Sequence, residues 1–215
     1  MESKIKIYKT RGDYACEMLD KYYPISPNKI ISDIGAGYGH MQTKVSELGA
    51  KWQPFDYVKK MEWSIIWDLN NPAPNTAENA GLAIFLEVLE HLPNPLLSLK
   101  NISSHIEKGG FIILTTPNPQ SSKNIINLFL KGTLYAFQEK HLKEYHVFTP
   151  WEHIVKHFLK ECGFEIIDYA IVDTTYCTRK ISSFKDGVKY LFEKILERKN
   201  IKSKGMSYGI VVKKI

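Results

Sequence analysis

Hydrophobic positions along the chain fall into two kinds of segment, which alternate. One kind is a short apolar or β-branched run, which predicts a strand. In the segments between these runs, apolar residues recur three or four positions apart, as at Met41, Val45 and Leu48, and this spacing predicts helices. Strands alternating with helices predict an α/β fold with a doubly wound sheet. The short apolar or β-branched runs that predict seven strands are residues 29–34, 50–57, 62–68, 81–86, 111–116, 164–172 and 207–214.

Capping residues mark where several helices begin and end. Asn94 followed by Pro95 predicts an N-cap and a first helical position, with the helix running to Lys108. The sequence "TPWE", Thr149–Glu152, has the pattern of a capping box, and Gly163 predicts the end of the helix that follows. Residues 8–23 and 183–199 also have amphipathic patterns that predict helices.

Composition limits the classes of protein to which the chain can belong. With 215 residues, 44% of them hydrophobic and 24% charged, the chain suits one domain, 1–215. It has no apolar run long enough for a transmembrane helix and no signal-peptide core, so we expect a cytoplasmic protein without membrane insertion. Cys16, Cys162 and Cys177 form no Cys-x-x-Cys pair, which argues against a disulfide framework or a zinc cluster. The net charge of +6 fits a solvated surface or an anionic partner.

The segment "DIGAGYG", Asp33 to Gly39, follows the first predicted strand. Its glycines, Gly35, Gly37 and Gly39, lack a Cβ and tolerate positive φ, so they let the backbone approach a ligand closely. A dinucleotide fingerprint needs Gly-x-Gly-x-x-Gly, and His40 stands where its third glycine would be. The spacing therefore argues against a nicotinamide-dependent oxidoreductase.

This Gly-x-Gly-x-Gly loop preceded by Asp33 resembles motif I of class I S-adenosylmethionine-dependent methyltransferases. The resemblance continues through "LEVLEHLPNP", "GGFIILTTPNP" and "HVFTPWEHIVKHFLKECGFEI", which are similar to the small-molecule branch, including ubiquinone-pathway O-methyltransferases and surface-glycan methyltransferases. It implies a Rossmann-like sheet of seven strands, mostly parallel with an antiparallel last strand, and helices on both faces. Two features depart from related patterns: Ala80 and Gly81 replace the usual aspartate of the fourth strand, and no Asn-Pro-Pro-Tyr motif follows that strand, which argues against adenine or glutamine methylation.

The resemblance implies S-adenosylmethionine as cofactor and S-adenosylhomocysteine as product. It places Asp33, Gly35, Gly37, Gly39 and Glu87 in the cofactor site. Asp56 lies 23 residues after Asp33 at the end of the second strand, where an acid can accept from a ribose diol, although a turn aspartate would also fit.

After the third strand, the resemblance implies that Asp68 accepts from the adenine amino group and that Leu69 offers its backbone amide. Asn70 is the alternative polar group, and Asp68 could instead cap a turn.

The run "EVLEH" holds the candidate general bases. Glu87, Glu90 and His91 follow the fourth strand, and His91 is favoured because its ordinary pKa near 6.5 lets it take a proton at neutral pH. The alternative is that Glu90 and His91 only brace the loop. In ubiquinone-pathway enzymes the same motif holds a divalent metal, so Glu87, Glu90 and His91 are also the candidate metal ligands, a role we rank below catalysis without metal.

Residues 119–149 correspond to the family's acceptor lid. His146 and His141 are alternative bases there, with His146 preferred. The resemblance divides the chain into an N-terminal cap helix (1–28), a cofactor-binding half (29–118), the lid and a C-terminal half (150–215). On the cap helix, Tyr8, Arg11 or Tyr14 would lie near the cofactor carboxylate.

The function that follows is methyl transfer to a small-molecule acceptor, with a hydroxyl oxygen of a sugar or surface-glycan precursor suggested by analogy alone. An RNA methyltransferase and a non-catalytic cofactor-binding subunit are the alternatives. The absence of an appended RNA-binding module disfavours nucleic acid. The sequence leaves the oligomeric state open.

Overall fold

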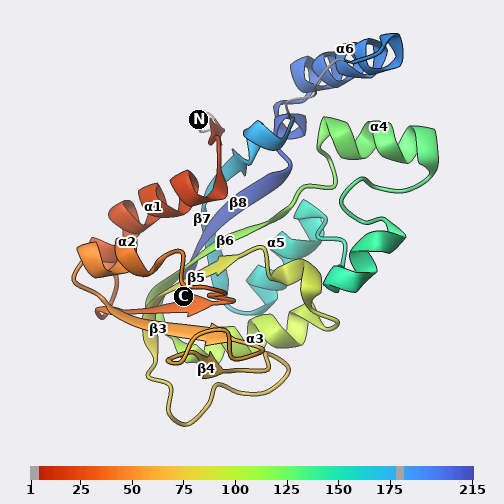
Figure 1. Ribbon diagram of the computed structural model, residues 1–215. Coiled ribbons are helices and arrows are strands. Elements are labelled where there is room, and N and C mark those ends of the chain that lie inside the picture. The colour runs from red at the N-terminus through yellow and green to blue at the C-terminus, as the bar shows by residue number, and fades with distance from the viewer. Residues whose placement is uncertain (1–4, 178–181) are drawn as a thin grey trace.

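The computed structural model describes residues 5–177 and 182–215, and an eight-stranded mixed sheet lies at its centre (Figure 1). Every neighbouring pair is parallel except those made by the last strand, which is antiparallel to both of its neighbours. In order across the sheet the strands are β1 (Lys6–Ile7), β7 (Phe164–Val172), β8 (Ser207–Lys214), β6 (Ile106–Pro117), β5 (Ala80–Leu86), β2 (Ile30–Ile34), β3 (Lys51–Asp56) and β4 (Ile65–Ile66).

All seven expected strands are present, and the antiparallel last strand is confirmed. The eighth strand, β1, is a two-residue edge strand that pairs in parallel with β7. It is too short for alternation of apolar and polar residues to reveal it in the sequence.

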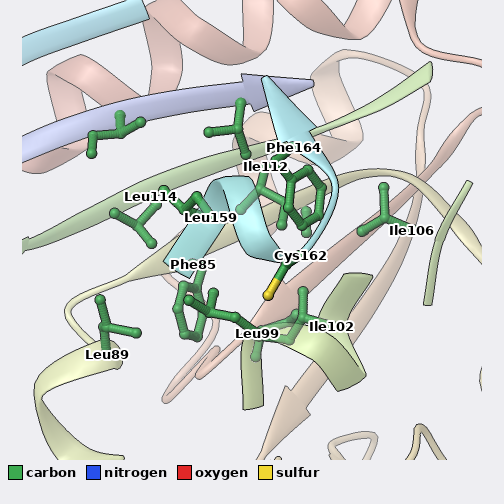
Figure 2. Close-up of a cluster of buried hydrophobic side chains, with 14 of the residues drawn as sticks. Phe85, Leu89, Leu99, Ile102, Ile106, Ile112, Leu114, Leu159, Cys162 and Phe164 are labelled. Atoms are coloured by element: carbon green, nitrogen blue, oxygen red, sulfur yellow. The ribbon is translucent and has the colours of Figure 1, made fainter. Parts of the chain in front are cut away.

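Helices cover both faces of the sheet, as expected. Side chains alternate along β5, so Leu82 and Ile84 pack with helices on one face while Phe85 packs on the other, where Figure 2 shows it near Leu99. The first face carries α1 (Arg11–Tyr22) and α2 (Gln42–Glu47), and the second carries α3 (Pro95–His105) and α5 (Glu152–Glu161). The remaining helices are α4 (Ser122–Lys131) and α6 (Phe184–Lys199), with short 3-10 turns η1 (Tyr23–Ile25), η2 (Leu89–His91), η3 (Glu139–Glu144), η4 (Thr174–Cys177) and η5 (Ile201–Lys204).

The helix boundaries confirm one cap and correct another. The Asn94 side chain accepts from the Leu97 N–H at 3.2 Å and Pro95 is the first residue of α3, as expected, although α3 ends at His105 because Ile106 already pairs with Ala80 in the sheet. The capping box expected at Thr149–Glu152 is wrong. Helix α5 begins at Glu152 without a side-chain cap, and the Glu152 carboxylate binds the ammonium groups of Lys156 and Lys202 instead of returning to the backbone at Thr149.

Parallel pairing brings the carboxyl ends of β2, β3, β5 and β6 to one edge of the sheet, which we call the carboxyl edge. The lid, with α4, follows β6 at this edge, and η2 follows β5. In a doubly wound sheet this edge is where ligands bind. Within the described residues no helix has the length and apolar character needed to cross a bilayer. Cys16 and Cys162 are free thiols, and the Cys177 side chain lies outside the described part of the chain.

Candidate active site

The three glycines after β2 all have positive φ, but they face different surroundings. A Cβ on Gly35 would lie 2.4 Å from Cγ2 of Val88, and one on Gly39 would lie 3.0 Å from Sδ of Met61. A Cβ on Gly37 would meet no atom within 4 Å among the described residues. Gly35 and Gly39 therefore make room for the protein's own side chains, whereas the space beside Gly37 is open.

Asp56, the last residue of β3, holds this loop. The N–H groups of Gly35 and Ala36 donate to the Phe55 carbonyl at 2.8 and 2.9 Å, and the Gly37 N–H donates to Oδ2 of Asp56 at 3.0 Å. Among the described residues, the other carboxylate oxygen, Oδ1, has only a long contact of 3.5 Å from the Val58 N–H. Because a carboxylate oxygen can accept more than one hydrogen bond, Asp56 can bind a hydroxyl donor while it holds Gly37.

Asp33 is buried near the carboxyl end of β2, just before the same loop. Its Oδ2 accepts from Nε1 of Trp52 at 3.2 Å. Burial is the main cause that raises the pKa of Asp33 to about 7; the Trp52 hydrogen bond opposes this rise, and the Asp56 charge adds to it. Asp33 therefore supports the loop from below as a carboxyl group that is partly protonated at neutral pH.

The oxygens of Asp68 are already engaged by its own turn. Oδ1 accepts from the backbone N–H and the side-chain amide of Asn70 at 3.0 and 2.9 Å, and Oδ2 accepts from the Asn71 amide at 3.1 Å. The neighbouring Leu69 is buried, and its carbonyl accepts from the Asn101 amide at 2.9 Å. These hydrogen bonds brace the turn after β4, and the ligand role of Asp68 stays a prediction.

Glu87 follows β5 with a φ of 53°, in the left-handed region that is uncommon outside glycine. Its Oε2 lies 3.1 Å from the Arg11 guanidinium and accepts from the Ser207 hydroxyl at 3.2 Å. Its Oε1 is buried and has no hydrogen-bond partner among the described residues. An orphaned buried carboxylate oxygen of this kind calls for a donor, which a ligand can supply.

Of the N-terminal residues expected near the cofactor carboxylate, Arg11 lies beside Glu87, whereas Tyr8 and Tyr14 are buried. Arg11 also binds Oδ2 of Asp173 at 2.8 Å, so its charge is shared between two acids of the protein. Tyr14 is fully buried and packs against Gly209, where a Cβ would lie 2.5 Å from the tyrosine ring. Tyr8 packs edge to face on Tyr14.

His91 and His146 come together although they are far apart in the sequence. Their ring centroids lie 4.8 Å apart at an angle of 81°. Nδ1 of His91 lies 2.7 Å from the Glu144 carbonyl oxygen, and Nδ1 of His146 lies 3.0 Å from that of Ala136. A carbonyl only accepts, so each Nδ1 carries a hydrogen, and in the neutral form of either ring the lone pair is on Nε2.

The buried Glu90 carboxyl group lies close to these two histidines. It is 1% exposed, accepts from the Thr116 hydroxyl at 3.1 Å and lies 3.9 Å from Nε2 of His91. Its carbonyl accepts from the N–H groups of Val147 and Phe148, which joins the lid to η2. Burial raises the pKa of Glu90 well above its ordinary value and lowers that of His91, so both groups favour their neutral forms.

One atom each from Glu90, His91 and His146 lie within 4.8 Å of one another, close enough to hold a metal ion. The structure therefore groups His146 with Glu90 and His91, whereas Glu87 turns to Arg11 and Ser207. His141 stacks on His146, and its Nδ1 accepts from the Gln138 N–H at 3.1 Å, so that ring nitrogen is used within the lid.

Sequence reasoning missed the groups that hold the two histidines. The carbonyls of Glu144 and Ala136 belong to turns of the lid, and any residue there supplies a carbonyl, so no residue type marks them. It also missed Val88 and Met61, which occupy the space beside Gly35 and Gly39.

Comparison with known proteins gives one family and many structures. A model of a family described as a methyltransferase domain matches residues 9–169. The structure resembles a SAM-dependent methyltransferase from Archaeoglobus fulgidus, with 19% identity, a TM-score of 0.60 and 94% of each chain covered. It also resembles a methyltransferase structure from Bacillus halodurans, described there as putative, with 18% identity, a TM-score of 0.59 and coverage of 92% of this chain and 99% of the other.

A third similar structure is an S-adenosylmethionine-dependent methyltransferase from Mesorhizobium loti, with 14% identity, a TM-score of 0.57 and coverage of 94% of this chain and 99% of the other. At these identities the likeness shows a shared fold. No curated protein sequence matches the chain.

Proposed function

Since the chain belongs to the methyltransferase-domain family, we propose that it transfers a methyl group to a hydroxyl oxygen of a small-molecule acceptor. It is a methyltransferase enzyme whose cofactor is S-adenosylmethionine. The observation that carries the choice of a hydroxyl is the free Nε2 of His91, since transfer to a hydroxyl requires a base. A sugar or surface-glycan precursor is the acceptor class we favour, by analogy with enzymes whose sequences resemble "HVFTPWE".

The residues present fit the cofactor. S-adenosylmethionine, when bound, supplies an electrophilic methyl group on a positively charged sulfur. Gly37 leaves open space, Asp56 has an oxygen available for the ribose hydroxyls, and Glu87 has a buried orphan oxygen that suits the amino group. On the adenine side the candidates are Asp68 and the Leu69 amide, with the Asp68 oxygens also engaged by Asn70 and Asn71.

In our proposal His91 is the general base. The Glu144 carbonyl holds its Nδ1 hydrogen, so Nε2 is the nitrogen that takes the acceptor's hydroxyl proton. Burial keeps the ring neutral at pH 7, which is the form that can accept a proton. Val88, three residues before His91, contacts the glycine loop at Gly35, and this contact links the base to the cofactor side.

His146 has the same arrangement and would be either the base or the group that positions His91. Its Nδ1 donates to the Ala136 carbonyl, so in the neutral ring Nε2 is the nitrogen that can accept a proton. The group of Glu90, His91 and His146 supports a second version of the mechanism, in which these three would hold a divalent ion that orients the acceptor oxygen. Chelator treatment separates the two versions, because only the second loses activity.

The test is formation of S-adenosylhomocysteine by the purified chain with a panel of acceptors. The panel pairs hydroxyl compounds, including sugars, with amines of the same skeleton, and adds RNA as a further arm. Turnover with a hydroxyl compound but not with its amine partner is the expected result. Turnover with RNA alone would overturn the small-molecule proposal, and cofactor binding with no turnover on any acceptor would favour a non-catalytic subunit.

A further inference from the structure

Helix α6 stands in a connection that the sheet does not require. Strands β7 and β8 are antiparallel neighbours, and Val172 pairs with Ser207 at the point where the chain leaves and re-enters the sheet. A hairpin turn could join two such strands. Instead residues 173–206 intervene, and they lie beyond residues 9–169, which match the methyltransferase domain.

The helix packs on the protein with its polar side. Its buried residues are Glu193 and Glu197, and Glu197 accepts from the Ser122 hydroxyl of α4 at 3.0 Å. A surface helix of a globular protein ordinarily does the opposite and buries its apolar stripe. The large apolar side chains that α6 exposes share one helical face: Phe184 (88% exposed), Val188, Leu191, Phe192 and Ile195.

The C-terminal end of α4, the helix on which α6 packs, also exposes apolar side chains. Leu128, Phe129 and Leu130 are exposed there, Phe129 to 88%. Figure 1 shows α4 and α6 projecting together from the same end of the molecule, away from α1 and α3. Along the first turns of α6, Phe184, Val188 and Leu191 together with Ser182, Ser183 and Gly187 form an open, shallow surface. Large exposed apolar patches of this kind mark interaction sites.

Basic residues surround the apolar face. Lys185, Arg198 and Lys199 are exposed on α6, and Lys131 is exposed at the end of α4. Two of the three acids of α6, Glu193 and Glu197, are the buried ones. An apolar face bordered by cations complements an anionic bilayer, where apolar side chains enter the headgroup boundary and lysines meet acidic lipids. A second copy of the chain would instead bring like charges together.

We propose that the exposed faces of α6 and of the end of α4 form a docking surface for an anionic lipid bilayer. The contact is peripheral, which agrees with the lack of a membrane-crossing helix among residues 5–177 and 182–215. Both helices follow strands whose carboxyl ends lie near the candidate active site, so docking turns the carboxyl edge toward the lipid. This inference concerns a surface and does not depend on which acceptor is methylated.

Vesicle flotation of the purified full chain tests it. The vesicles contain phosphatidylcholine alone or an equal mixture of phosphatidylcholine and phosphatidylglycerol. The expected result is binding to the anionic vesicles, with at least about tenfold weaker binding to the neutral ones, and loss of binding as NaCl rises from about 0.1 to about 0.5 M. Equal binding to both compositions, or none to either, would overturn the proposal.

Two pairs of variants locate the surface. Phe184→Ser with Phe192→Ser should weaken vesicle binding at least about tenfold, because two apolar anchors are lost, while Ile25→Ser, a change at an equally apolar residue 65% exposed on η1, should leave it unchanged. Arg198→Glu with Lys199→Glu should weaken it, whereas the same charge change at Lys29 and Lys108, which are exposed near the amino ends of β2 and β6, should have a smaller effect. Circular dichroism and cofactor binding check that every variant is folded.

The competing occupant is a second copy of the chain. Light scattering of the wild-type chain and of the Phe184→Ser, Phe192→Ser variant measures this directly. A monomer that floats with anionic vesicles supports the proposal. A dimer that the double substitution dissociates, in a chain that ignores vesicles, would assign the surface to self-association and contradict it.

Discussion

The carboxyl edge of the sheet has two sides that are built differently. On the cofactor side, the glycine loop is held by the neighbouring strand: Gly35 donates to the Phe55 carbonyl and Gly37 to the Asp56 carboxylate. On the acceptor side, His91 and His146 come from segments 55 residues apart and are held by carbonyls of the lid. The first side depends on two adjacent strands, and the second on a loop that closes over η2.

This difference explains which chemistry each side can perform. On the cofactor side, the backbone of the glycine loop and the Asp56 carboxylate are held in place, which suits binding of a molecule that is the same in every reaction. The acceptor side places two imidazoles with free Nε2 atoms against a lid, which suits proton transfer and a variable substrate. Changes on the two sides should therefore separate binding from turnover.

The largest expected effect is on turnover. His91→Ala should lower kcat by about 10²- to 10⁴-fold, the usual contribution of a general base, and leave cofactor affinity within about twofold. His153→Ala, which removes an exposed histidine of α5, is the matched control. If kcat is unchanged in both His91→Ala and His146→Ala, the general-base proposal is wrong.

The pH dependence of kcat also tests whether His91 is the general base. Because burial lowers the pKa of His91, wild-type kcat should rise with pH through a pKa below 6.5 and then stay level. Initial rates from about pH 5 to 8 measure this. A profile that begins to rise only above pH 7 would exclude a neutral, buried imidazole as the base.

The glycines allow binding to be separated from stability on the cofactor side. Gly37→Ala places a methyl group in the open space and should weaken cofactor binding by about tenfold or more, at a cost of about 1 kcal/mol in the free energy of unfolding from its φ of 57°. Gly35→Ala meets Val88 and should destabilise by about 2 to 4 kcal/mol, strain at φ added to overpacking. Calorimetric titration and urea unfolding of both variants measure the contrast. Equal losses of stability would contradict the different surroundings of the two glycines.

Two buried groups, His105 and Asp33, make the free energy of unfolding depend on pH. Burial lowers the pKa of His105, which lies 2.8 Å from the Ser32 hydroxyl, to about 4. The unfolded chain then binds this proton first, so the stability that His105 contributes is lost as pH falls from 6.5 to 4, up to about 3 kcal/mol. Asp33 acts in the opposite direction, because its folded pKa of about 7 is above its ordinary 3.8 and stability is lost as pH rises through that range, by up to about 4 kcal/mol.

Asp33→Asn separates these two effects. The variant should gain stability relative to wild type as pH rises from 4 to 7, because it no longer has a carboxyl group that must ionise in a buried site. Urea unfolding of both proteins across this range measures the difference. A difference that stays constant with pH would show that the folded pKa of Asp33 is close to its unfolded value.

Much of the cofactor side could be predicted from the sequence, because its geometry is local. A β-branched run, three glycines and an acid at the end of the next strand specify residue types at fixed places, and the Asn94 cap of α3 was predicted in the same way. The sequence could not predict which face of α6 packs on the protein, because an amphipathic pattern does not say which of its two faces is buried. The capping box at Thr149 failed because Glu152 binds two lysines, one of them 50 residues away.

Calorimetric titration of the chain with S-adenosylmethionine, S-adenosylhomocysteine and NAD, repeated on Asp56→Ala, tests the assignment of the cofactor site. We expect binding of the first two and not of NAD, and about a hundredfold loss of affinity in the variant, since hydrogen bonds to the ribose are removed and the Gly37 N–H loses its acceptor. Asp68→Ala is the comparison, with a smaller loss expected because that carboxylate braces its own turn. Binding of NAD alone, or affinity unchanged in Asp56→Ala, would contradict the assignment of the glycine loop and Asp56 to this cofactor.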